Sequence, residues 1–243
     1  MKDFLTFIQE KADLTLEYHD ELNSKFWDGE KLKSDVRKHL IMVANKWAVF
    51  SKIPKSGIKE IILTGGNANF NYTKFSDLDV HLIVDFESVS DCDQDFVDEF
   101  LRDKKTIWQL THDIKIYGTP VEVYAEQTVP SKKSQGVYSL TKDDWIQKPK
   151  KENVKFKSDD LLKSKVDHYV HMINYALKHH ADEEETLGKI KERIRNMRGA
   201  AVRKAGEFSV ENLVFKELRN RGILDKMTDH IRNIQDKKLS LKK

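Results

Sequence analysis

Two aspartates, Asp77 and Asp79, have the spacing in this chain that most strongly suggests chemistry. They open an apolar run over 80–84, which predicts a buried strand. Residues two apart on a strand point to the same face, so the two carboxylates are expected to project side by side. Such a pair is costly unless a cation lies between its members. Oxygen ligands on a rigid element suit Mg²⁺, which binds through one or two carboxylates and the phosphates of a substrate.

A glycine turn precedes the aspartates. The apolar residues 61–63 predict a strand that runs into Thr64, Gly65 and Gly66, and a short polar loop leads from there to the aspartates. Because glycine has no side chain, its backbone N–H group can approach an anion closely. The sequence therefore places a candidate anion-binding turn next to a candidate cation site.

Further carboxylates follow in a predicted β-hairpin. Residues 112–117 alternate between polar and apolar, 118–120 are typical of a turn, and 121–124 alternate again. Glu122 is the sole acid of the second strand, which can lie beside the strand of the aspartates. Asp113, one strand earlier, competes with Glu122 as a third carboxylate of the site.

The order of a Gly-Gly turn, a spacer and Asp-x-Asp on an apolar strand resembles the signature of the polymerase-beta-type nucleotidyltransferase superfamily. The wider stretches 67–70 and 76–81 are similar to nucleotidyltransferase-like proteins encoded by large bacteriophages. The resemblance covers roughly residues 58 to 125, about a quarter of the chain. Gly66 departs from the pattern, because the family usually has serine there. The phosphate site thereby loses a hydroxyl, for which Thr64 or Asn67 is expected to compensate.

In this family three carboxylates, two from one strand and one from a neighbouring strand, hold two divalent metals. The third acid lies in an apolar strand with apolar residues on both sides. The resemblance therefore implies Asp77, Asp79 and Glu122 as metal ligands and catalytic residues. Asp85 and Glu87 fit less well, since they lie past the end of the apolar run. The implied cofactor is a pair of Mg²⁺ ions, with Mn²⁺ as a substitute.

The implied activity is the Mg²⁺-dependent transfer of a nucleoside monophosphate from an NTP, ATP among them, to a hydroxyl group. In the family the third acid often takes the proton of the acceptor, so Glu122 is expected to serve twice. RNA or tRNA is the first choice of acceptor. The residues expected to bind nucleotide or phosphate are Thr64, Gly65, Gly66, Asn67, Ser76 and Lys132.

Two other functions fit the same motif. One is a catalytically degenerate nucleotide- or RNA-binding module, which Gly66 favours. The intact pair Asp77 and Asp79 argues against it, because buried paired acids are costly to keep without a metal. The other is a toxin-like transferase that modifies a host tRNA or protein, and its chemistry would be the same.

Composition predicts a globular cytoplasmic protein, in the host cytoplasm if a phage encodes it. The 243 residues are 34% charged and 39% hydrophobic, which allows a sizeable core. No apolar run approaches the roughly 20 residues of a membrane helix. The first residues, 1–4, include an early acid and do not resemble a secretory signal. The single cysteine, Cys92, cannot form an internal disulfide, which suits a reducing compartment.

The net charge of +3 is unevenly distributed. Residues 148–243 hold 24 of the 43 Lys and Arg and 15 of the 40 Asp and Glu, a balance of +9. Residues 1–147 hold the remaining 19 basic and 25 acidic residues, a balance of −6. An acidic metal-binding half joined to a basic half favours a polyanionic substrate.

Hydrophobic periodicity predicts the elements that position the site. Residues 32–50 have apolar positions three and four apart, which indicates an amphipathic helix, and residues 4–8 suggest a shorter one. A helical stripe over 91–104 separates the aspartate strand from the hairpin and predicts a strand–helix–strand crossover. The expected fold class is α+β: a small mixed β-sheet nucleotidyltransferase core flanked by helices, with a C-terminal helical bundle.

Three regions are expected along the chain. Residues 1–130 form the nucleotidyltransferase core with its N-terminal helices, 131–157 a connector, and 158–243 a basic helical domain. In the connector, Tyr138 is a candidate for stacking on a base. In the helical domain, Ser209 is expected to cap a helix and Gly222 to end it. Further candidate phosphate ligands in this domain are Arg195, Arg198 and Arg203.

Overall fold

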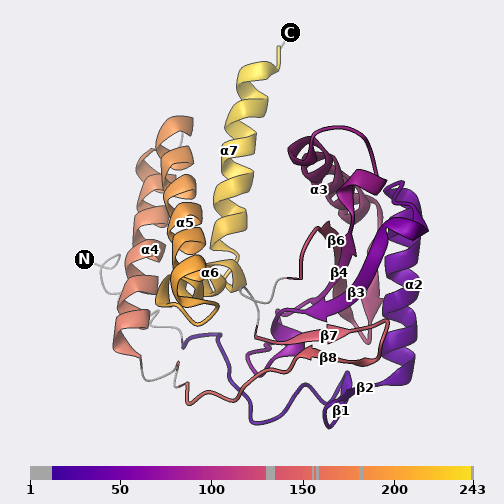
Figure 1. Cartoon of the computed structure of the whole chain (residues 1–243). Helices are drawn as coiled ribbons and strands as arrows, with labels where there is room; N and C mark the ends of the chain where they lie inside the picture. The colour runs from indigo at the N-terminus through magenta and orange to yellow at the C-terminus, as the bar shows by residue number, and fades with distance from the viewer. Residues whose placement is uncertain (1–12, 130–134, 155, 157–158, 181–182, 242–243) are drawn as a thin grey trace. The chain divides into compact units, whose positions relative to one another are not determined.

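The computed structural model describes residues 13–129, 135–154, 156, 159–180 and 183–241. The chain forms two compact units (Figure 1). One comprises Tyr18–Asn153, and the other combines Met1–Glu17 with Val154–Lys243. None of the described helices combines the length and the apolar character that a bilayer crossing requires.

The first unit is built on a six-stranded sheet, and it contains the predicted mixed arrangement. The strands, in spatial order, are β5 (Lys115–Ile116), β6 (Thr119–Glu126), β4 (Leu78–Val84), β3 (Ile58–Thr64), β7 (Val137–Ser139) and β8 (Asp144–Gln147). β4 and β6 are parallel, and the other neighbouring pairs are antiparallel. A separate two-stranded sheet consists of β1 (Trp27–Asp28) and β2 (Lys31–Leu32). The fold class is therefore α+β, as the sequence predicts.

The predicted crossover between β4 and β6 is confirmed, and its helix is longer than expected. α3 (Gln94–Thr111) begins after Asp93, whose side chain accepts a hydrogen bond from the backbone N of Asp95 at 2.9 Å. It continues past the expected end at residue 104 because Trp108 extends the buried stripe by another turn. A parallel pair of strands needs such a crossover connection, and a helix supplies it.

One face of the sheet carries the hydrophobic core of this unit. The strands contribute the alternate positions Ile61, Leu63, Leu78, Val80, Leu82, Val84, Val121, Val123 and Ala125. α2 (Ser34–Phe50) and α3 bury their apolar stripes in the same cluster, so both helices cover this face. Period-two alternation then leaves the other face of β4 and β6 for the residues between these positions, which include the predicted acids.

The hairpin of β5 and β6 is confirmed, but its turn lies earlier than expected. Tyr117 and Gly118 are the turn residues, with φ of +49° and +76°, and Thr119 already belongs to β6. Two successive positive φ angles are typical of the tight turns whose twist matches that of the flanking strands. Pairing therefore resumes two residues sooner than the Gly-Thr-Pro pattern suggests.

Part of the expected connector adds two strands to the sheet. β7 pairs with β3, and β8 pairs with β7. Tyr138 is fully buried between Trp27 and Trp145, with ring centroids 5.1 Å from each, so it is a packing residue and not a platform for a base. The apolar residues around Tyr138 explain why this segment packs into the core.

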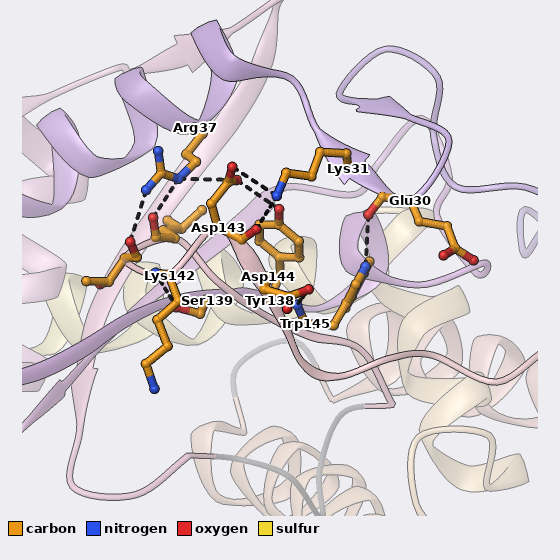
Figure 2. A network of polar contacts seen from close by, with 11 residues as sticks. Glu30, Lys31, Arg37, Tyr138, Ser139, Lys142, Asp143, Asp144 and Trp145 are labelled. Carbon is orange, nitrogen blue, oxygen red and sulfur yellow. Dashed lines mark hydrogen bonds and ion pairs between the residues drawn. The ribbon is translucent and has the colours of Figure 1, made fainter.

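A polar network around Asp143 secures the β7–β8 turn (Figure 2). The Tyr138 hydroxyl donates to Asp143 Oδ1 at 2.9 Å, Lys31 Nζ lies 3.1 Å from Oδ2, and Arg37 Nε lies 3.3 Å from Oδ1. Arg37 Nε also donates to the Leu140 carbonyl oxygen at 2.7 Å. Burial raises the pKa of Asp143, but the hydrogen bonds from Tyr138 and Lys31 and the charge of Arg37 outweigh it and hold that pKa below its ordinary value.

The second unit contains the predicted C-terminal helices. They are α4 (Asp160–His179), α5 (Glu184–Ala205), α6 (Val210–Asn220) and α7 (Ile223–Leu239). Gly222 adopts the left-handed conformation between α6 and α7, with φ of +69°, as expected of a helix-ending glycine. Ser209 precedes α6 as predicted, but its side chain makes no cap hydrogen bond.

A buried carboxylate ties the start of the described chain to these helices. Glu217 on α6 is fully buried and accepts hydrogen bonds from Thr15 N at 3.0 Å and from Thr15 Oγ1 at 2.7 Å. Arg221 Nε donates to the same carboxylate at 2.7 Å. These bonds satisfy a charge that would otherwise be costly to bury. The helix expected over 4–8 lies outside the described residues.

Candidate metal centre

The register of the sheet aligns the predicted acids. Asp79 of β4 lies opposite Glu122 of β6 and, on its other side, opposite Thr64 of β3. Side chains at aligned positions of neighbouring strands point to the same face. Asp77 lies two residues before Asp79 and therefore projects from that face as well. The three carboxylates thus share the sheet face opposite the hydrophobic core.

The carboxylates converge closely enough to share an ion. One oxygen each of Asp77, Asp79 and Glu122 lies within 4.8 Å of the others, and all three residues are partly buried. Within the described parts of the chain, no other group of three His, Cys, Asp or Glu residues meets this criterion. A set of hard carboxylate oxygens fits Mg²⁺ or Mn²⁺ better than zinc, which favours nitrogen and sulfur ligands.

Gly65 gives the Asp79 carboxylate the space that it occupies. The backbone of Gly65 has φ of +77°, which side chains rarely tolerate. A Cβ atom added there would lie 1.8 Å from Asp79 Oδ2 and 2.8 Å from Asp79 Cγ. Any other residue at this position would displace the carboxylate. The glycine turn therefore shapes the acidic cluster directly, a role in addition to the anion binding that the sequence predicts.

Asn67 connects the glycine turn to the aspartate loop. Its side chain is buried, and Nδ2 donates to the backbone carbonyl oxygens of Asp77 at 2.7 Å and Ser76 at 3.3 Å. Its Oδ1 accepts a hydrogen bond from Asn23 Nδ2 at 3.0 Å, and its own carbonyl accepts one from Trp27 Nε1 at 2.7 Å. The sequence predicts Asn67 as a phosphate ligand; in the structure its side chain holds the backbone of Ser76 and Asp77.

Thr64 is likewise engaged inside the protein. It is 3% exposed, and its hydroxyl donates to the carbonyl oxygen of Gly136 at 3.0 Å. The hydroxyl of Ser76, by contrast, lies beside the turn: a Cβ atom at Gly66 would be 2.9 Å from Ser76 Oγ. Ser76 Oγ accepts a hydrogen bond from the backbone N of Thr73 at 2.9 Å. Lys132, the remaining expected phosphate ligand, lies outside the described residues.

Lys105 of α3 reaches the acidic cluster, which the sequence analysis missed. Its Nζ lies 2.9 Å from Glu122 Oε2 and 4.4 Å from the centroid of the Tyr124 ring. A signal was present in the sequence: Lys105 follows Val97 and Leu101 at intervals of four residues, where the buried stripe of α3 would place an apolar residue. A lysine in such a stripe indicates a partner for its charge.

Tyr124 and His81 continue the polar face beyond the acids. Burial raises the pKa of Tyr124, and the nearby charges of Asp79 and Glu126 add to this effect, so the phenol is neutral at physiological pH. The buried His81 ring packs at a tilt of 44° against the Tyr124 ring, with centroids 3.8 Å apart, and its Nδ1 lies 3.4 Å from Glu126 Oε2. These side chains form a second row next to the carboxylates, in register with them along β4 and β6.

The competing acids lie elsewhere. Asp113 precedes β5, with its side chain 78% exposed and 2.7 Å from Lys115 Nζ. Asp85 follows β4 and lies 3.3 Å from Lys59 Nζ, and Glu87 is exposed. Glu122 is thus the downstream acid that the structure brings to the aspartates.

The arginines expected to bind phosphate are placed in the second unit. Arg195 and Arg203 are exposed on α5. Arg198 lies over the Phe215 ring at 4.2 Å, and its Nε donates to Asn212 Oδ1 at 3.1 Å. These contacts give Arg198 a role in packing α5 against α6.

Comparisons with known proteins add no relative to this description. The chain matches no model of a protein family, no curated protein and no solved structure. The residues of the site and the resemblance of its motif are therefore the only indications of function.

Proposed function

We propose that this protein is a metal-dependent nucleotidyltransferase, which transfers a nucleoside monophosphate from an NTP to a hydroxyl acceptor. The observation that carries the proposal is the convergence of Asp77, Asp79 and Glu122 on one sheet face beside Gly65. Asp77 directly precedes β4, Asp79 lies on β4, and Glu122 lies on the parallel neighbour β6, an arrangement that agrees with the resemblance of the motif.

The three carboxylates would hold two Mg²⁺ ions, for which Mn²⁺ would substitute. Asp77, Asp79 and Glu122 offer only hard oxygen ligands, and their partial burial makes a nearby cation favourable. Bound Mg²⁺ would neutralise charge on the triphosphate and lower the pKa of the acceptor hydroxyl.

The chain's own groups would orient the substrates and move the proton. The acceptor oxygen forms a bond to the α-phosphorus while the bond from that phosphorus to the β-bridging oxygen breaks, and pyrophosphate leaves. Glu122 would take the proton of the acceptor hydroxyl. No electron transfer occurs, so no redox partner is needed.

Phosphate binding is assigned to the turn and to Ser76. The backbone N–H groups of Gly65 and Gly66 would donate to phosphate oxygens. Ser76 Oγ lies next to Gly66 and retains a proton that it can donate, because its bond with Thr73 uses it as an acceptor. Ser76 would therefore supply the hydroxyl that Gly66 lacks. Thr64 and Asn67 would hold the shape of the site from inside.

RNA is the proposed acceptor class. Residues 148–243 have a charge balance of +9, whereas 1–147 have a balance of −6. A basic region attracts the phosphate backbone of a nucleic acid at long range. A toxin-like transferase would use the same site, so growth on expression of the wild type and Asp77→Asn distinguishes this case: toxicity that depends on Asp77 supports it.

The first test is calorimetric titration of ATP, GTP, CTP and UTP, each with Mg²⁺. Wild type is expected to bind at least one NTP, and Asp77→Asn/Asp79→Asn to lose that binding while remaining folded. Asp113→Asn is the matched control, because this exposed acid lies outside the cluster. Failure of folded wild type to bind any NTP contradicts the proposal.

Transfer is then measured with the bound NTP, labelled at the α-phosphate, and total RNA. Label in RNA together with released pyrophosphate is the expected result. Metal-dependent NTP binding without transfer to any RNA, protein or small hydroxyl compound would instead support the degenerate binding module.

A further inference from the structure

We propose that Lys105 is a substrate-binding residue that contacts the polyphosphate of the nucleotide. This inference rests on the proposed function, because it names a further ligand of the same site. It starts from the position of Lys105 on the crossover helix α3, with its Nζ 2.9 Å from Glu122 Oε2. The lysine therefore reaches a carboxylate that a metal would also use.

A metal ion and an ammonium group would compete for the Glu122 carboxylate. Glu122 pairs with Lys105 in the absence of metal, but a divalent cation held by the same carboxylate would repel the ammonium group. The expected consequence is that metal binding weakens the ion pair between Lys105 and Glu122. Lys105 would then need another anionic partner close by.

The Tyr124 ring gives Lys105 a second contact at the site, which remains when Glu122 binds a metal. Lys105 Nζ lies 4.4 Å from the centroid of this ring, within the range of a cation–π contact. Tyr124 is half-buried on β6, and its ring packs against the His81 ring with centroids 3.8 Å apart. Lys105 thus has two contacts of different kinds, and only the one to Glu122 competes with metal binding.

The charges of the site indicate which group would pair with Lys105 once metal is bound. Asp77, Asp79 and Glu122 carry three negative charges and Lys105 one positive charge. With two Mg²⁺ ions these four groups would have a net charge of +2, since four positive charges are added to −2. A polyphosphate supplies the compensating negative charge and can bind an ammonium group and metal ions at once.

The alternative is that Lys105 only neutralises Glu122 and never touches substrate. Both roles predict that loss of the lysine strengthens binding of metal alone, because Glu122 is released. They differ in nucleotide binding, which a counter-ion to Glu122 would not improve.

Two titrations separate the roles, one with Mn²⁺ alone and one with each NTP in saturating Mg²⁺. The variants are Lys105→Gln and Lys105→Met, of which the second keeps the apolar stem, and Lys105→Arg, which keeps the charge. Lys104→Gln is the matched control, because Lys104 is the neighbouring residue and its Nζ lies over the Phe50 and Phe100 rings at 5.4 and 5.2 Å. The melting temperature of each variant reports whether it is folded.

The expected result is that Lys105→Gln and Lys105→Met bind Mn²⁺ more tightly than wild type but bind the NTP about tenfold more weakly, the loss of one charge-assisted hydrogen bond. Lys105→Arg is expected to retain most NTP affinity, and Lys104→Gln to match wild type in both titrations. Wild-type NTP affinity in folded Lys105→Met overturns the inference and leaves the proposed function intact. A wild type that binds Mn²⁺ but no NTP overturns the proposed function and this inference together.

Discussion

Two clusters of charged side chains in the first unit differ in how their charges are matched. Around Asp143, a single carboxylate lies within ion-pair distance of two cations, Lys31 and Arg37, and accepts a hydrogen bond from Tyr138 (Figure 2). At the candidate metal centre, three carboxylates converge, and Lys105 pairs with one of them. The first arrangement stabilises a turn, whereas the second concentrates negative charge.

This difference separates a structural network from a candidate binding site. Folding favours paired charges, because a partly buried carboxylate gains from each cation or donor that faces it. Like charges that converge lower stability unless a ligand compensates them, and such a cost is typical of functional sites. We therefore expect metal binding at the acidic cluster to raise the stability of the protein, and low pH to remove the stability that the Asp143 network contributes.

The largest effect is expected from Gly65→Ala. Its Cβ would overlap Asp79 Oδ2, at 1.8 Å, so Mn²⁺ affinity is expected to fall by about 100-fold or more. Calorimetric titration with Mn²⁺ measures the loss. Gly118→Ala is the matched control, because Gly118 has almost the same φ, +76° against +77°, but nothing within 4 Å of the added Cβ. Equal Mn²⁺ affinity of the two variants would show that the space left by Gly65 for the Asp79 carboxylate does not affect metal binding.

Metal alone is expected to stabilise the protein. Ligand binding to the folded state at 100 times its dissociation constant adds about 2.7 kcal/mol to the free energy of unfolding. Urea denaturation of wild type with and without Mg²⁺ or Mn²⁺ measures this gain, and a chelator is expected to reverse it. Asp77→Asn/Asp79→Asn should show no gain, while Asp143→Asn should show the full gain. An equal gain in stability for these two variants would show that the acidic cluster is not the site where the metal binds.

Asn67→Ala is expected to lower both stability and metal affinity. The change removes the bonds to the carbonyls of Ser76 and Asp77 and leaves Asn23 without this partner, at a cost of about 2 kcal/mol in the free energy of unfolding. Urea denaturation measures the first effect and Mn²⁺ titration the second. A loss of stability with unchanged Mn²⁺ affinity would restrict Asn67 to a structural role.

The smallest effect is expected from Asp143→Asn, at about 1 kcal/mol or less, because the ion pairs are partly exposed. The pKa of Asp143 in the folded state lies below its ordinary value of 3.8. Its contribution is therefore fully present above that ordinary value and is lost as pH falls through the lower folded pKa. Stability of wild type and variant, measured from pH 7 to pH 2, should converge at the acidic end. A constant difference would mean that the charge of Asp143 contributes nothing.

Local patterns of the sequence determine much of the fold. The stripes of α2 and of the C-terminal helices, the alternation of β4 and β6 and the conformation of Gly222 all follow from spacings within a few residues. The local sequence likewise determines that Asp77 and Asp79 project side by side, because the alternation of side chains in an extended segment is a property of the backbone.

Contacts between distant segments were decided by the tertiary structure. The pairing of β7 with β3 joins residues about 75 positions apart, and a three-residue strand has too weak a local pattern to predict that partner. The pairing of β4 with β6 places Glu122 beside Asp79, whereas Asp113 precedes the edge strand β5. The register also matters, because a shift of one residue would send Glu122 to the opposite face.

The candidate site combines both kinds of information. The types of its residues, two aspartates, a glutamate and a glycine turn, could be identified from the sequence alone. Only the tertiary structure shows that Gly65 leaves the space that the Asp79 carboxylate occupies. It alone also shows that Lys105 of α3 reaches Glu122. Spacing along a strand sets where a side chain points, but only the packing of strands and helices sets which groups it meets.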